Sequence, residues 1–181
     1  GFTVSGLQGS DTVASLSSVA ASGATGKNAG SYTNTVTAGT ETNYTVTTVN
    51  GSLTIAKANA TVTANSGTLT YNGGNQTVSG FTASGLVGGE TASVLSGVTA
   101  SRTEKNAGTY ATTASGTDGN YNLSFVDGSM LINKAALTAT GNSTSVTYNG
   151  ANQTVSGFTV SGLQGSDTVA SLSSVAASGA T

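Results

Sequence analysis

The sequence predicts an all-β chain built as a tandem array of small antiparallel β-sandwich modules. Two observations predict this fold: near-identical internal repeats, and short runs in which apolar and polar residues alternate. Small polar residues dominate the chain, with 33 Thr, 26 Ser, 26 Gly and 15 Asn among 181 residues. Only 7% of the residues are charged and the net charge is −2, so the composition is not that of a highly charged disordered chain.

The repeats set the length of the module. Residues 1–25 recur without change at residues 157–181, and a diverged copy begins at Gly80. The step from Gly80 to Gly157 is 77 residues (157 − 80), which is long enough for a small domain with its own core. This step divides the chain into the C-terminal part of one module (1–57), a complete module (58–134) and the N-terminal part of the next (135–181).

Period-two alternation predicts the strands of each module. Branched Thr and Val side chains suit a pleated surface, and alternation with a polar outer face is typical of antiparallel sheets that cover a core on one side. We therefore expect an immunoglobulin-like sandwich. The inward-facing sets are Ala60, Val62 and Ala64; Tyr110, Thr112 and Ala114; Tyr121, Leu123 and Phe125; and Tyr44 and Val46.

Asn-Gly and Asp-Gly pairs predict the turns. Asp127 and Gly128 stand between two apolar runs, and Asn50 and Gly51 hold the same place one repeat earlier. Such pairs accept the positive φ angles of a two-residue type I′ turn, so both predict a β-hairpin. The pairs at 72–73 and 149–150 predict further turns.

One segment of each module has a helical signal. Residues 10–16 carry N-cap residue types followed by apolar residues three apart, and residues 89–95 are their counterpart. The signal allows one short helical turn per module. The alternative is an irregular connection with a strand at 13–16.

The central module contains an ordered set of motifs at residues 60–64, 71–73, 79–81, 85–92, 106–110, 120–121 and 126–132. This set resembles the MBG/YDG-type repeat, which occurs in tandem in very large bacterial surface adhesins. Many of those adhesins are secreted by two-partner systems related to filamentous haemagglutinin. The resemblance implies a β-rich extracellular stalk module without catalytic residues. One departure is Tyr-Asn-Gly at 71–73 and 148–150, where the family often has Tyr-Asp-Gly.

Composition excludes several classes of site. The chain has no His and no Cys, which removes Ser-His-Asp and Cys-His catalysis, ordinary zinc sites and disulfides. We therefore expect no enzyme, no catalytic residue, no metal and no cofactor. Five basic residues are too few for nucleic acid, and no apolar run is long enough for membrane insertion. No targeting segment is visible, so we interpret the chain as an internal window of a longer polypeptide.

Several residues have two interpretations, one as a binding or reactive site and one as a structural residue. Asp118 is weighed as a calcium ligand at a module junction against a solvated loop charge, and Lys57 and Lys134 as isopeptide donors against junction charges. The Thr-x-Thr pairs have two interpretations. They form an ice-binding ladder, or they are ordinary strand residues that face the solvent. Seven N-x-S/T sequons are weighed as glycosylation sites against chance occurrences in a chain rich in Asn, Ser and Thr. They begin at Asn43, Asn50, Asn59, Asn75, Asn122, Asn142 and Asn152. The aromatic residues are expected in cores, with each Tyr at least half buried: Phe2, Phe81, Phe125, Phe158, Tyr32, Tyr44, Tyr71, Tyr110, Tyr121 and Tyr148.

These features predict a structural function. We expect a stalk or filament segment of a long bacterial cell-surface or biofilm-matrix adhesin, located outside the cell. Its expected partners are neighbouring modules of the same chain or filament, with matrix polysaccharide and lateral contacts between like fibres as further alternatives. Two other functions remain open. One is a filament subunit that polymerises when residues 135–156 are donated to the fragment 1–57 of another copy. The other is a carbohydrate-binding module.

Overall fold

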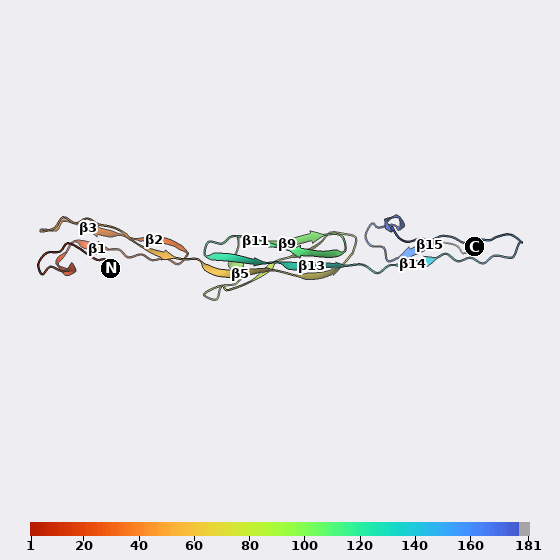
Figure 1. Cartoon of the computed structure of the whole chain (residues 1–181), viewed down its shortest axis with the longest axis horizontal. Coiled ribbons are helices and arrows are strands. Elements are labelled where there is room, and N and C mark those ends of the chain that lie inside the picture. The colour runs from red at the N-terminus through yellow and green to blue at the C-terminus, as the bar shows by residue number, and fades with distance from the viewer. Residues whose placement is uncertain (178–181) are drawn as a thin grey trace. The chain divides into compact units, whose positions relative to one another are not determined.

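The computed structural model describes residues 1–177 and confirms the predicted all-β fold (Figure 1). This part of the chain contains fifteen short strands and three one-turn 3₁₀ helices. The chain divides into two compact units. The first comprises Gly1–Thr61, Ser84–Gly97 and Gly116–Ser124, and the second comprises Val62–Ala83, Val98–Ser115 and Phe125–Thr181. Each unit therefore combines one part of the central repeat, 58–134, with a neighbouring repeat, while the repeat boundaries themselves stay a prediction from the sequence.

The repeat that precedes the central one contains two antiparallel strand pairs. β1 pairs with β3, Val19 lying opposite Ala38, and β2 pairs with β4, Gly30 lying opposite Ile55. A 3₁₀ turn, η1, precedes them. The elements are η1 (Val13–Ser15), β1 (Val19–Ala21), β2 (Gly30–Asn34), β3 (Val36–Ala38) and β4 (Gly51–Ile55).

The central repeat contains three three-stranded sheets. Their strand orders are β12-β5-β8, β11-β9-β7 and β10-β13-β6. The elements are β5 (Ala58–Ala64), β6 (Gly67–Thr70), β7 (Gln76–Ser79), β8 (Phe81–Ser84), η2 (Ala92–Val94), β9 (Val98–Glu104), β10 (Gly108–Thr112), β11 (Ala114–Gly116), β12 (Tyr121–Val126) and β13 (Gly128–Asn133). The last repeat has β14 (Thr138–Gly141), β15 (Phe158–Ser161) and η3 (Val169–Ser171), with β14 and β15 antiparallel.

Consecutive strands of the central repeat change sheet at a single break. β7 and β8 are separated only by Gly80, and β12 and β13 only by Asp127, yet the two strands of each couple belong to different sheets. Gly80 has φ +88°, and a Cβ there would lie 2.8 Å from the side-chain nitrogen Nδ2 of Asn65. The backbone N–H of Asn65 donates to the Gly80 carbonyl at 3.0 Å, and the Asn65 side-chain amide donates to the Ser79 carbonyl at 3.1 Å. Glycine is required at this break because only it combines a positive φ with so close an approach.

The predicted hairpins at Asp127-Gly128 and Asn50-Gly51 are wrong. β12 and β13 do not pair with each other, and neither glycine has a positive φ. A Cβ on Gly128 would lie 2.5 Å from the Ala64 carbonyl oxygen, so this glycine serves a close approach of two backbones and not a turn. The sheets are also not purely antiparallel, because β13 runs parallel to β6 with Leu131 opposite Thr68.

Other local predictions are confirmed. Gly73 and Gly150 have φ +79° and +74°, as the predicted turns require. A 3₁₀ turn occurs at the same place in all three repeats, so the alternative of a strand at 13–16 is wrong. The turn ends on Leu95 in the central repeat, which is 1% exposed, because the turn directs this side chain into the interior.

The core of the second unit confirms the alternation, with two exceptions among the aromatic residues. Val78, Met130 and Ile132 form a buried cluster, and partly buried Leu69, Tyr71, Ala107 and Tyr110 pack against it. Val62 and Ala64 are also buried, as predicted. Phe125 is 37% exposed and Tyr148 is 90% exposed, so both were wrongly assigned to a core. Phe125 lies next to the break between β12 and β13, where the inward face of the strand changes.

Candidate functional site: module junctions and an open groove

Asp118, the residue considered above as a calcium ligand, makes structural hydrogen bonds. In residues 1–177 no group of three acidic, His or Cys side chains is placed to hold a metal ion. The Asp118 carboxylate accepts the backbone N–H groups of Asn120 at 2.7 Å and Tyr121 at 3.1 Å, which fixes the loop that leads into β12. No helix in this part of the chain is long and apolar enough to cross a membrane.

A tyrosine–carboxylate pair ties the loop before the 3₁₀ turn of a repeat to a later segment of the same repeat. The Tyr121 hydroxyl donates to the Glu90 carboxylate at 2.5 Å and accepts the Val87 N–H at 3.0 Å. The same arrangement joins Tyr44 to Asp11, also at 2.5 Å. The hydrogen bond to the carboxylate raises the pKa of each tyrosine, because ionisation of the phenol would place two negative charges side by side.

A clasp in the first unit joins the preceding repeat to the central one. The Asn120 side chain accepts the Ala29 N–H at 2.9 Å and donates to the Asn28 side chain at 3.2 Å. The Tyr32 hydroxyl donates to the Asn28 carbonyl at 2.8 Å and so holds the loop that presents both groups. The sequence placed Asn120 in one of the ordered motifs, at residues 120–121, but nothing in it indicated that this residue contacts the loop at Asn28 and Ala29.

Lys57 reinforces the clasp. Its ammonium group donates to the Asp118 carbonyl oxygen at 2.7 Å, and the N–H of the next residue, Ala58, donates to the Asn120 carbonyl at 2.9 Å. Residues 118–120 thus receive two donors from the segment that links the repeats. Lys57 is thus a charged residue bound at the junction between two repeats, which was the structural alternative to an isopeptide donor.

The second unit contains the junction with the following repeat. The Tyr71 hydroxyl donates to the Asp167 carboxylate at 2.8 Å, which raises the tyrosine pKa. A Cβ on Gly73 would lie 2.8 Å from the Gln164 carbonyl, so the two loops touch through their backbones. A cavity of about 330 Å³ adjoins this contact, and Lys134 lines it. The Tyr-Asn-Gly motif therefore lies at a module junction.

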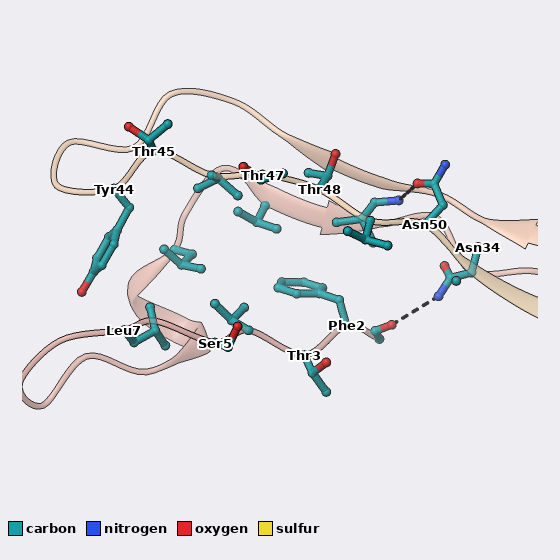
Figure 2. Close-up of a pocket in the computed structure, with 18 residues that line it drawn as sticks. Phe2, Thr3, Ser5, Leu7, Asn34, Tyr44, Thr45, Thr47, Thr48 and Asn50 are labelled. Carbon is teal, nitrogen blue, oxygen red and sulfur yellow. Dashed lines mark hydrogen bonds between the residues drawn. The ribbon is translucent and has the colours of Figure 1, made fainter.

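An open groove lies within the first unit. It has a volume of about 740 Å³ and is bounded by residues 1–7 on one side and 44–51 on the other. Figure 2 shows the Phe2 ring between these two walls, with Tyr44 at one end of the groove and Asn50 at the other. The Asn50 side chain accepts the Val36 N–H at 3.0 Å, and the Asn34 side chain donates to the Gly1 carbonyl at 3.3 Å.

The remaining candidate residues divide into exposed and engaged groups. All seven sequon asparagines are exposed. Five of the six tyrosine hydroxyls are engaged within the chain; besides the three bound to carboxylates, Tyr32 and Tyr110 donate to backbone carbonyls at 2.8 and 3.1 Å. Tyrosines engaged in this way and more than half buried are poorly placed to form a platform for stacking sugars.

The comparison with known families decides the identity of the fold. The sequence profile of the MBG domain (YGX type) matches residues 1–54 and again residues 60–131. The chain belongs to the MBG domain family. The two successive MBG matches indicate a tandem repeat domain of the kind found in surface proteins. No curated protein and no solved structure matches the chain.

Proposed function

We propose that this tandem MBG chain is a structural segment, a stalk or filament, of a long bacterial cell-surface or biofilm-matrix adhesin. The junction clasp carries the proposal. A repeat that only linked other domains would need no specific contact with its neighbour, whereas Asn120 and Lys57 both bind across a junction. Such contacts stiffen an array because adjacent modules then move together.

The composition suits this role. Few charges and abundant Ser, Thr and Asn keep the surface hydrated without attracting charged partners. The absence of cysteine avoids disulfide formation during export. The partners of the segment are then neighbouring modules, and its location is extracellular. Catalysis, a metal and a cofactor have no part in the proposal.

The test is surface labelling combined with a mass measurement. An antibody raised against residues 58–134 is applied to intact cells that produce the protein, and the labelled polypeptide is then sized after boiling in detergent. The proposal predicts a label on unpermeabilised cells and a single polypeptide that holds many modules. Labelling that requires lysis, or a polypeptide of only 17.4 kDa, would overturn it.

A further inference from the structure

The central repeat joins its opening and closing strands by a parallel ladder. β13 runs parallel to β6, and residues 130–133 lie opposite residues 67–70. Opposed residues are 63 positions apart in the sequence (130 − 67). The ladder continues past the end of β6, because the Tyr71 N–H donates to the Asn133 carbonyl at 2.8 Å. A strand near the start of the repeat is thus bonded directly to the strand that ends it.

The same relation holds for the strands that come before β6 and β13. β5 pairs with β12, and the two strands begin side by side, because the Ala58 N–H donates to the Asn120 carbonyl at 2.9 Å. The next contact is between side chains, where the Asn122 amide donates to the Asn59 oxygen at 3.4 Å. These two residues are again 63 positions apart. β5 and β12 therefore also run parallel.

The two segments change sheet at the same level. Only Asn65 and Ser66 separate β5 from β6, as Asp127 separates β12 from β13. The Ser66 hydroxyl accepts the Ser129 N–H at 3.0 Å, and this pair is also 63 positions apart. The close approach of Gly128 to the Ala64 carbonyl lies at the same point. Residues 58–71 and 120–133 are therefore in contact before, at and after the break.

Buried side chains cover the ladder between β6 and β13. Met130 and Ile132 of β13 belong to the buried cluster with Val78, and Leu69 and Tyr71 pack against it. A hydrogen bond in such surroundings is electrostatically stronger than one in water. The bonds between the two segments are thus placed where they resist replacement by water.

Tension along a tandem array enters a repeat at its first residue and leaves it at its last. It pulls β6 towards Gly67 and β13 towards Asn133. Because the two strands are parallel, these pulls act in opposite directions along one ladder. All the bonds between the strands are then strained together. A pull on the same end of both strands would instead break the bonds one after another, which needs less force.

We propose that residues 58–71 and 120–133 form a mechanical clamp, which gives the central repeat its resistance to tension along the chain. The use of this clamp in the cell rests on the proposed stalk function. The resistance itself is a property of the chain and does not depend on that function.

Two pulling directions on the full 181-residue chain test the clamp by single-molecule optical tweezers. The chain has no native cysteine, so handles can be attached at chosen exposed positions. Ala56→Cys with Lys134→Cys loads the ladder from opposite ends. Asn75→Cys with Lys134→Cys loads it from one end, because the neighbouring Gln76 side chain donates to the Thr70 carbonyl at 3.1 Å and so lies at the end of β6.

The unfolding force is compared at one pulling speed. The two pairs release 78 residues (134 − 56) and 59 residues (134 − 75), so the gain in length identifies unfolding of the central repeat. We expect a higher unfolding force for the 56/134 pair than for the 75/134 pair. An equal or lower force for the 56/134 pair would overturn the inference.

A matched pair of serine variants tests which bonds resist the load. Ser66→Ala removes the acceptor of the Ser129 N–H, whereas Ser101→Ala changes an exposed serine of β9 outside the clamp. Loss of one typical hydrogen bond should speed unfolding of the 56/134 pair at constant force about 2- to 10-fold. Ser101→Ala should leave this rate within about twofold of the unmodified chain. Equal rates in the two variants would refute the clamp.

The outcomes of the two proposals can be told apart. The tweezers measure the purified chain, whereas surface labelling and polypeptide size concern the place of the chain in the cell. A weak 56/134 direction would remove the clamp and leave the surface location untouched. Labelling that requires lysis would remove the stalk function and leave the measured resistance in place.

Discussion

Asn120 is the residue on which the junction clasp depends, and Asn120→Ala tests it. The change removes the acceptor for the Ala29 N–H and the donor to Asn28. A typical hydrogen bond contributes about 0.5–1.5 kcal/mol, and a partly buried N–H left without an acceptor costs about 1–3 kcal/mol. We therefore expect the junction to lose about 1–2 kcal/mol, and the substitution to leave the sheets of both repeats intact.

Amide hydrogen exchange measures this loss at the affected atom. A loss of about 1.4 kcal/mol raises the equilibrium population of the open junction about tenfold, so the Ala29 amide should exchange about tenfold faster in Asn120→Ala. The matched control is Asn120→Asp, which keeps an acceptor for the Ala29 N–H and loses only the donor to Asn28. The exchange rate of the Ala29 amide in this variant should lie between the rates in the unmodified chain and in Asn120→Ala. Unchanged exchange at Ala29 in Asn120→Ala would refute the assignment of a clasp.

Three further predictions concern the modules themselves. Thr112 is fully buried and its hydroxyl has no partner among the described residues, so Thr112→Val should raise the free energy of unfolding by about 1 kcal/mol in a urea titration. The exposed control Thr109→Val should change that free energy by less than about 0.5 kcal/mol. A lower free energy of unfolding in Thr112→Val would contradict this prediction. Gly128→Ala should cost about 1–3 kcal/mol by overpacking against the Ala64 carbonyl, and a neutral result would show that the two backbones are not in close approach. The hydrogen bond to Glu90 raises the pKa of Tyr121, so this bond stabilises the fold fully below pH ~10, the pKa of an unfolded tyrosine. The stabilisation is lost as the pH rises through the folded-state pKa of Tyr121. The free energy of unfolding should therefore fall at alkaline pH, and it should fall less steeply in Tyr121→Phe.

Much of the module could be predicted from the sequence, because the relevant signals are local. Alternation at Ala60, Val62 and Ala64 placed the buried face of β5 correctly, since side chains of a strand point to opposite sides at every step. The helical turn was one of the two alternatives for residues 10–16, because N-cap residue types followed by apolar residues three apart form a short-range pattern. The repeats then carried each assignment from one module to the next.

The pairing of strands could not be predicted, because it depends on residues far apart in the chain. Asp127 and Gly128 have the residue types of a hairpin turn, but the second strand pairs with β10 and β6 and not with its predecessor. The sequence does not distinguish a glycine needed for a close approach of two backbones from a glycine needed for a positive φ. The clasp was missed for a similar reason: Asn120 and Ala29 are 91 residues apart, and an asparagine in a loop is ordinarily assigned to a turn.

The central claim is that junction contacts hold neighbouring MBG modules in a fixed relation, as a stalk requires. Spin labels on the exposed positions Thr37 and Ser124 test it directly, because the chain has no native cysteine and both sites lie in the first unit on either side of the junction. Pulsed electron paramagnetic resonance then gives the distribution of distances between the labels. The account predicts one narrow distribution that broadens in Asn120→Ala. A broad distribution in the unmodified chain would mean that the modules move independently, and would contradict the proposal of a stiff stalk.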